Sequence, residues 1–382
     1  MIAIVSRNEL FDAVECARKG ISTKSTLPVF MCLRIEATED NRLDIAGATI
    51  DLISRVHLTV IEVQRKGGLL VPCSPFAELL AQLPECVIRL EAKDYQLHVS
   101  VVDGAFRSKI AGFDISDFPE LLVHDGVEAT CDKDTLVKIS STVGHFVSRD
   151  TSRLVLTGVC LTRTRTHALA VATDGHRLSR YTALGFRFTD DAPARSEWIV
   201  DPKALKTIIG MSSDAITARL SDQWITLASS PTEWMRCEVS SRLIDGPYPD
   251  WRQTVRSASA HQLAFARDPL LSCLKRAMAV SRGPSPRIIV RGIPTGVVIA
   301  SYGPQGLERE GLESLGTIEP TRDVPEWSCN PVHLEEIVSM CPAGDVKVGI
   351  EAPLKAIHVA PTKGDGQFFL LMPIRIEEGA AK

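Results

Sequence analysis

The chain has 382 residues, which is too long for one ordinary hydrophobic core and predicts two or three domains. Its formal net charge of −4 argues against a protein that grips nucleic acid by bulk electrostatics. No run of about 18 apolar residues and no signal-peptide pattern is present, so neither a membrane span nor export is expected. Ten scattered cysteines without a C-x-x-C pair favour buried thiols in a reducing cytoplasm. We expect no metal site and no cofactor.

A helix pattern recurs near the start of each third of the chain. Residues 7–18, 132–146 and 268–280 place apolar side chains three and four positions apart, which predicts one buried stripe along each helix. Asp132 and Asp268 stand where an N-cap or a first-turn acid stabilises a helix. In the helix over 132–146, the expected stripe includes Leu136 and Val137.

A second helix pattern is repeated at equal spacing. It covers residues 71–80, 200–209 and 329–338, so that consecutive copies begin 129 residues apart. Each copy has a Pro in or just before its first turn, which is compatible with a helix start. Each also has apolar residues at i, i+3 and i+4, which predicts a short helix with one buried face.

Alternating runs lie between the helices. Residues 89–92 and 96–99, and later residues 224–227, alternate apolar and polar side chains, as strands buried on one face do. Together with the paired helices, they predict an α+β fold. It consists of three tandem domains, each with two helices packed on antiparallel sheet. The expected boundaries are 1–122, 123–250 and 251–382.

The most informative segment is residues 170–180. An apolar strand runs into Asp174-Gly175, a pair that tolerates the positive φ of a tight turn. Polar residues crowd around this turn next to Leu178. The turn alone does not explain them, and they suit either a proton-transfer site or the rim of a docking surface.

The 170–180 segment and the threefold repeat together resemble the bacterial beta sliding clamp family, the beta subunit of DNA polymerase III. Residues 26–28, residues 117–119 and the Met-Pro-x-Arg phrase at 372–375 carry the same resemblance. It implies a head-to-tail homodimer whose six domains form a ring around duplex DNA, with helices lining the hole. Such a ring needs only weak, sequence-independent phosphate contacts, because linkage around the duplex retains it.

The resemblance also implies partners and site residues. The partners are double-stranded DNA, a second copy of the chain, the DNA polymerase III alpha subunit, a separate ATP-driven clamp loader and other proteins with a clamp-binding motif. The groove for that motif would be formed by Val155, Leu156, Thr173, Gly175, His176, Arg177, Leu178, Pro249, Leu370, Met372, Pro373, Ile374 and Arg375. The expected DNA-facing cations are Lys24, Arg149, Arg7, Lys138, Lys203, Lys206, Lys275 and Arg276. The expected dimer contacts are Phe106, Arg107, Lys109, Ala279 and Val280, with Glu308, Glu310 and Glu313 complementing the basic pair.

Some positions depart from the family pattern. Val155 stands where a bulky aromatic often forms a pocket wall, and a polar tail follows at 377–382. These departures leave open a specialised paralogue that acts as a protein-binding adaptor. An enzyme using Asp174 and His176 is the other alternative. The sequence has no nucleophile elbow, no phosphate loop and no H-E-x-x-H motif, which argues against it.

Overall fold

The computed structural model describes residues 1–22, 25–119, 125–189, 197–255, 261–283, 285–302, 310–318, 324–364 and 366–376. The chain divides into two compact units. Unit 1 comprises Met1–Ser140, Arg163–Ala168 and Leu184–Asp245, and unit 2 comprises Ser141–Thr162, Leu169–Ala183 and Gly246–Lys382. Within the described ranges, every helix is too short or too polar to cross a membrane.

A similar order of elements occurs three times along the chain, as the repeat predicts, although the described part of the third repeat has one strand fewer between its two helices. The first repeat contains β1 (Ile2–Ser6), α1 (Arg7–Ala17), β2 (Cys32–Ala37), β3 (Arg42–Ala48), β4 (Leu52–Thr59), β5 (Glu62–Arg65), β6 (Gly67–Pro72), α2 (Cys73–Gln82), β7 (Val87–Lys93), β8 (Gln96–Val101) and β9 (Arg107–Ala111). The second contains β10 (Val127–Asp132), α3 (Lys133–Lys138), β11 (Val159–Arg163), β12 (Ala168–Thr173), β13 (Arg177–Ala183), β14 (Phe186–Phe188), β15 (Glu197–Val200), α4 (Pro202–Ile209), β16 (Ala215–Leu220), β17 (Trp224–Thr232) and β18 (Met235–Arg242).

A short helix, α5 (Arg252–Val255), precedes the third repeat. That repeat contains β19 (His261–Ala266), α6 (Arg267–Val280), β20 (Ile288–Ile293), β21 (Gly296–Tyr302), β22 (Glu310–Gly316), β23 (Trp327–Cys329), α7 (Pro331–Met340), β24 (Asp345–Ile350), β25 (Ile357–Pro361) and β26 (Gln367–Leu371). The α+β class and the paired helices are therefore confirmed. The boundaries 1–122, 123–250 and 251–382 stay predictions.

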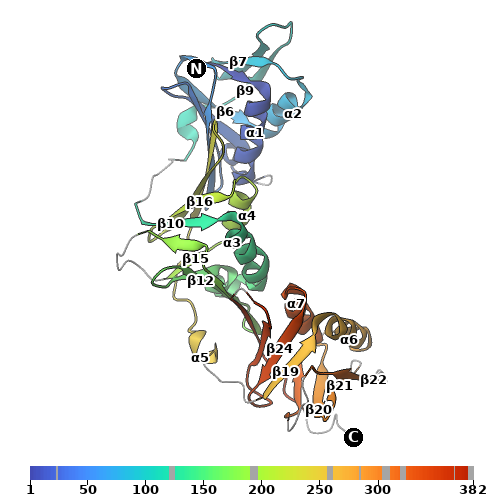
Figure 1. Cartoon of the computed structure of the whole chain (residues 1–382). Helices are drawn as coiled ribbons and strands as arrows, with labels where there is room; N and C mark the ends of the chain where they lie inside the picture. Colours follow the sequence, from blue (N-terminus) through green and yellow to red (C-terminus); the bar gives the residue numbers. More distant parts are fainter. Residues whose placement is uncertain are drawn as a thin grey trace. The chain divides into compact units, whose positions relative to one another are not determined.

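The two helices of each repeat pack against each other. Contacts join α1 to α2, α3 to α4, and α6 to α7, and Figure 1 shows the first and last pairs beside their sheets. The predicted stripes supply the buried faces, with Leu10 on α1, Phe76 on α2 and Leu334 on α7 fully or almost fully buried. Each such side chain contributes about 1.5–3 kcal/mol through burial.

The helix expected over 132–146 is only partly regular. Asp132 is its N-cap, accepting a hydrogen bond from the Thr135 N–H at 2.6 Å, as predicted. The regular α-helix ends at Lys138 and is followed by a π-turn over Ile139–Val143. Val143 in this turn is buried, whereas Val137, which precedes the turn and is one position past the buried Leu136, points away from the core and is exposed. Val137 was therefore wrongly placed in the stripe.

Antiparallel sheets join successive repeats inside each unit. Unit 1 has a five-stranded sheet, β5-β1-β7-β8-β9, and a nine-stranded sheet, β14-β10-β16-β17-β18-β4-β3-β2-β6. Unit 2 has the strand order β11-β12-β13-β26-β25-β24-β19 and a four-stranded sheet, β22-β21-β20-β23. We call the β4–β18 pairing the first seam and the β13–β26 pairing the second seam. In both seams, the third strand after a repeat's first helix pairs with the last strand of the next repeat.

Candidate partner-binding surface

The turn between β12 and β13 is built from short polar contacts. Gly175 has φ +92°, a conformation that side chains disfavour. The Thr173 hydroxyl donates to the Arg177 carbonyl at 2.7 Å and accepts from the Gly175 N–H at 3.1 Å. The predicted Asp-Gly turn is thus confirmed, with glycine at the residue that needs positive φ.

Asp174 organises this turn. Its Oδ1 accepts hydrogen bonds from the backbone N–H groups of His176 at 2.9 Å and Arg177 at 3.0 Å. Its Oδ2 accepts from Arg177 Nε at 3.0 Å. The His176 ring instead lies 6.4 Å from the His333 ring, centroid to centroid. The carboxylate therefore holds the loop in shape, and these contacts do not form an acid–base pair with the imidazole.

Arg177 ties the turn to α7. Its side chain is only 12% exposed, and Nη1 donates to Glu336 Oε2 on that helix. The guanidinium also lies 4.8 Å from the ring centroid of Phe146. Glu336 is 159 positions away in the sequence, and no local pattern marked it or Phe146 as a partner. Arg177 therefore connects the turn to α7 through its bonds to Asp174 and Glu336.

Apolar side chains meet across the second seam. Leu178 and Leu370 are opposite each other in β13 and β26, and both are buried. Beyond β26, the Met372 N–H donates to the His176 carbonyl at 2.8 Å, so the C-terminal segment continues beside the turn. The Met372 side chain is 42% exposed. An apolar floor with an exposed methionine at its margin results.

Two further segments approach the turn. The 3₁₀ helix over Thr151–Thr157 carries Val155, which is half-buried, and Leu156, which is buried. A side chain at Gly246 would come within 2.8 Å of Val155 Cγ1, so that loop packs on this helix. Tyr248, beside the exposed Pro249, accepts a hydrogen bond from the Thr173 N–H at 3.1 Å.

All the residues predicted for the groove lie in unit 2. Pro373 and Ile374 are half-buried and Arg375 is exposed. The Ile374 N–H donates to the Ser328 carbonyl at 2.8 Å, which fixes this end of the C-terminal segment. The sequence prediction therefore assembled residues that lie on neighbouring segments of one unit.

The predicted DNA-facing cations differ in how exposed their side chains are. Lys24 lies outside the described residues. Exposed side chains belong to Arg149, Lys203, Lys206 and Lys275, whereas Lys138 is half-buried. Lys203 and Lys206 are on α4 in unit 1, and Lys275 is on α6 in unit 2.

Arg7 and Arg276 have partners within the chain. Arg7 is half-buried, and its Nε donates to the Leu80 carbonyl near the end of α2 at 2.7 Å. Arg276 forms a two-donor ion pair with Glu313 on β22, with one N–O distance of 2.9 Å. This hydrogen bond raises the pKa of Arg276 and lowers that of Glu313. Neither arginine is an uncommitted surface cation.

The predicted dimer contacts lie at two sheet edges. Phe106, Arg107 and Lys109 are exposed on or beside β9, the last strand of its sheet. Ala279 is exposed and Val280 half-buried at the end of α6. A side chain at Gly311 would come within 3.2 Å of Val280 Cγ2, so this end of α6 packs beside the edge strand β22. Such edges present unpaired backbone groups for pairing with another chain.

Two curated relatives cover almost the whole chain. The beta sliding clamp of Chlamydia muridarum is 23% identical over 98% of this chain and 99% of that protein. The beta sliding clamp of Bacillus subtilis is 20% identical over 97% of this chain and 98% of that protein.

Solved clamps have the same fold. A DNA polymerase sliding clamp from Pseudomonas aeruginosa has a TM-score of 0.88 at 18% identity, covering 98% of this chain and all of that one. The polymerase III beta subunit from Caulobacter crescentus has a TM-score of 0.86 at 18% identity, with the same coverage. The sequence models for the N-terminal and central domains of the DNA polymerase III beta subunit match residues 1–122 and 130–250. The chain therefore belongs to the DNA polymerase III beta subunit family, the bacterial beta sliding clamps.

Proposed function

We propose that two copies of the chain form a closed head-to-tail ring around duplex DNA and tether the replicative polymerase as its non-catalytic processivity subunit. The apolar floor at the second seam carries the tethering part of this proposal. Leu178 and Leu370 form that floor, and the polar turn and the C-terminal segment flank it. An apolar surface with a few oriented polar groups suits a short peptide anchor.

Met372 gives the surface adaptability. It is exposed beside the floor, and a methionine side chain adjusts its shape to different apolar partners. We assign motif binding to this surface for the polymerase alpha subunit, the clamp loader and other clamp-motif proteins. Because Arg177 is committed to Asp174 and Glu336, it contributes by holding the turn in place.

DNA would be held loosely. Lys203, Lys206, Lys275 and Arg149 provide exposed positive charge without a strongly basic domain. We add Lys24 from the family resemblance alone. Topological linkage makes tight phosphate contacts unnecessary and permits sliding. Loading would require an ATP-driven partner, and we place the protein in the cytoplasm.

Ring closure would join β9 of one copy to β22 of the next. Arg107 and Lys109 project from the first edge, and Glu310 and the exposed Leu312 from the second. Edge-to-edge pairing would satisfy backbone groups, and the opposite charges would favour the correct partner. Glu313 is already paired with Arg276, so Glu310 is the better acidic contact.

The first test is retention on DNA. The protein and a clamp loader are mixed with closed circular DNA, the solution mass is measured, and the circle is then linearised. A dimer of twice the 41.7 kDa chain mass that stays on the circle and leaves the linear DNA supports the ring. A monomer, or a dimer whose retention ignores DNA ends, contradicts it. A closed ring that fails to support primer extension identifies an adaptor paralogue instead.

The second test addresses the peptide surface. Leu178→Ala with Met372→Ala should reduce binding of a clamp-motif peptide at least ~10-fold, because both apolar contacts are lost. The exposed Leu354 in unit 2 offers a matched control, and Leu354→Ala should leave the affinity unchanged. Fluorescence anisotropy measures the binding, and gel filtration checks that the dimer persists. Unchanged affinity in the double variant would refute the groove assignment.

A further inference from the structure

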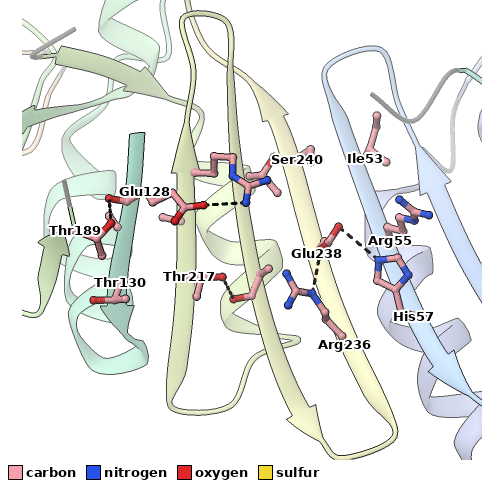
Figure 2. A pocket seen from close by; sticks show the side chains of 15 residues that line it. Ile53, Arg55, His57, Glu128, Thr130, Thr189, Thr217, Arg236, Glu238 and Ser240 are labelled. Atoms are coloured by element: carbon pink, nitrogen blue, oxygen red, sulfur yellow. Dashed lines mark hydrogen bonds and ion pairs between the residues drawn. The ribbon is translucent and has the colours of Figure 1, made fainter. Parts of the chain in front are cut away.

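A cavity lies on the first seam, wholly inside unit 1. Its volume is about 400 Å³, within the ~300–1,000 Å³ of ligand pockets. Side chains from β4, β10, β16, β17 and β18 line it, and Figure 2 shows them on one face of the nine-stranded sheet. None of these residues belongs to the predicted peptide surface.

The internal repeat relates this cavity to the peptide surface. Ile53-Ser54-Arg55 on β4 has the same pattern as Leu178-Ser179-Arg180 on β13, and the central serine is buried in both. In the second seam Leu178 is opposite Leu370, and in the first seam Ile53 is opposite Ser240. The cavity therefore begins at the place that corresponds to the apolar floor of the second seam.

The floor of the cavity has small side chains. Thr217, Thr226, Ala228 and Ser240 occupy the strands in its middle. The hydroxyls of Thr226 and Ser240 are hydrogen-bonded to each other at 2.9 Å. Short side chains leave room for a polypeptide backbone to lie against the sheet, and the hydroxyls offer hydrogen bonds to it.

Charged side chains form the two walls. Arg219 is paired with Glu128 at 3.0 Å, and Arg236 is paired with Glu238 at 3.0 Å. The two arginine side chains are 42% and 55% exposed, and solvent screening makes ion pairs of exposed groups weak. Each guanidinium can therefore exchange its partner for an incoming carboxylate at small cost.

The wall on β4 is more rigid. Asp44 is 2% exposed and accepts from Arg55 Nη2 and His57 Nδ1, each at 2.6 Å, while His57 Nε2 lies 3.6 Å from Glu238 Oε2. Burial favours the neutral ring, but the contacts with Asp44 and Glu238 raise the pKa of His57. Figure 2 shows Arg55, His57, Arg236 and Glu238 grouped along this side.

We propose that this cavity is a second docking site, which takes an extended partner peptide carrying carboxylate side chains. Arg219 and Arg236, whose side chains are largely exposed, are the donors that a peptide carboxylate would meet, whereas Arg55 and His57 are held by the buried Asp44. Ile53 is its one large aliphatic side chain, so an apolar anchor of the kind proposed for the second seam has little to bind here. The repeat has thus produced two docking positions of opposite chemistry.

The test uses the full chain and a labelled ten-residue peptide of alternating Glu and Ser, with the Gln-for-Glu peptide as its neutral match. Fluorescence anisotropy at low salt should show saturable binding of the acidic peptide only. Arg219→Glu with Arg236→Glu should weaken it at least ~10-fold, because a favourable charge contact becomes repulsive. Lys93→Glu changes an exposed cation outside the cavity and should alter affinity less than ~2-fold.

A second variant fills the floor without changing charge. Ser240→Leu should block the acidic peptide while leaving binding of a clamp-motif peptide intact. Equal binding of the acidic and neutral peptides, or no effect of either variant, overturns the proposal. Binding of inorganic pyrophosphate that needs the same arginines, without peptide binding, identifies a small-anion site and also overturns it. Competition between the acidic and clamp-motif peptides would show that they share one site, against the assignment to separate seams.

Discussion

The two seams use the same strand pairing and have opposite side-chain chemistry. The first seam buries Asp44 among cationic partners on β3 and β4, with Glu238 on β18 completing the cluster. The second seam places Leu178 opposite Leu370. Backbone hydrogen bonds set both pairings, so side chains at equivalent positions were free to diverge. Repeat symmetry therefore predicts where a surface lies, whereas its residues determine what it binds.

One pair of arginines illustrates this divergence. Arg55 is opposite Glu238 in the first seam and donates to Asp44. Arg180, its counterpart, is opposite Phe368 and lies 5.0 Å from the centroid of that ring. Burial lowers the pKa of Arg180. The same side chain thus serves an ionic cluster in one seam and a cation–π contact in the other.

The largest expected effect comes from removing the buried carboxylate of the first seam. Asp44→Ala leaves Arg55 and His57 without their shared partner, so the free energy of unfolding of unit 1 should fall by about 3–5 kcal/mol. Glu39, an exposed acid paired with Lys66, is the control. Glu39→Ala should leave the free energy of unfolding nearly unchanged, because solvent screens this exposed pair.

Hydrogen exchange distinguishes the seams in these variants. Amides of β4 and β18 should exchange faster in Asp44→Ala, and those of β13 and β26 should keep their rates. Equal loss of protection in both seams would show that the ionic cluster does not act locally. A loss no larger than that of the control would show that the cluster is not stabilising.

A smaller effect is expected when the apolar seam is truncated. Leu370→Ala removes buried methyl groups opposite Leu178 and should lower the stability of unit 2 by about 2–4 kcal/mol. Ser240→Ala at the corresponding place in the first seam removes one hydroxyl contact and should cost about 1 kcal/mol or less. Denaturant unfolding, followed by hydrogen exchange in each seam, measures both. Similar costs would contradict the contrast between the seams.

The sequence predicted individual helices better than the strand pairings that join one repeat to the next. Helices 71–80, 200–209 and 329–338 were found because their apolar spacing and prolines are local signals, and all three form. The π-turn at Ile139–Val143 was missed because apolar spacing does not distinguish it from a regular helix. Strand pairing between β4 and β18 depends on the packing of two repeats, so no local sequence pattern predicted it.

The candidate site was predicted in part for the same reason. The turn at Asp174-Gly175 and the proximity of Met372 followed from a motif and a family resemblance. The ion pair between Arg177 and Glu336 could not be predicted in this way, because Glu336 is on a helix of the next repeat. The pairing of Arg276 with Glu313 was likewise not visible. Contacts between distant charged residues require the folded chain.

The smallest expected effect is a pH response of opposite sign at the first seam and at α7, which packs against β26. The pKa of His57 is raised among Asp44, Glu238 and the neighbouring Arg42, Arg55 and Arg236, so its contribution is complete below its ordinary value near 6.5 and is lost as pH rises through the raised value. Burial and the charge of Arg177 lower the pKa of His333 on α7, where Asp174 and His176 also face it. The contribution of His333 to the stability of the folded state is complete above about pH 6.5 and is lost as pH falls through the lowered pKa.

From pH 5.5 to pH 8, protection of the β4–β18 amides should therefore decrease relative to that of α7. His57→Gln should reduce stability more at pH 5.5 than at pH 8, and His333→Gln should remove the opposite dependence in unit 2. Each difference should be smaller than the ~2 kcal/mol lower bound for Leu370→Ala. The exposed His176 provides a control variant whose substitution should leave the first seam unaffected. If the first seam and α7 respond to pH with the same sign, the ring of His57 is not held by the two carboxylates, and the ionic character assigned to the first seam fails with it.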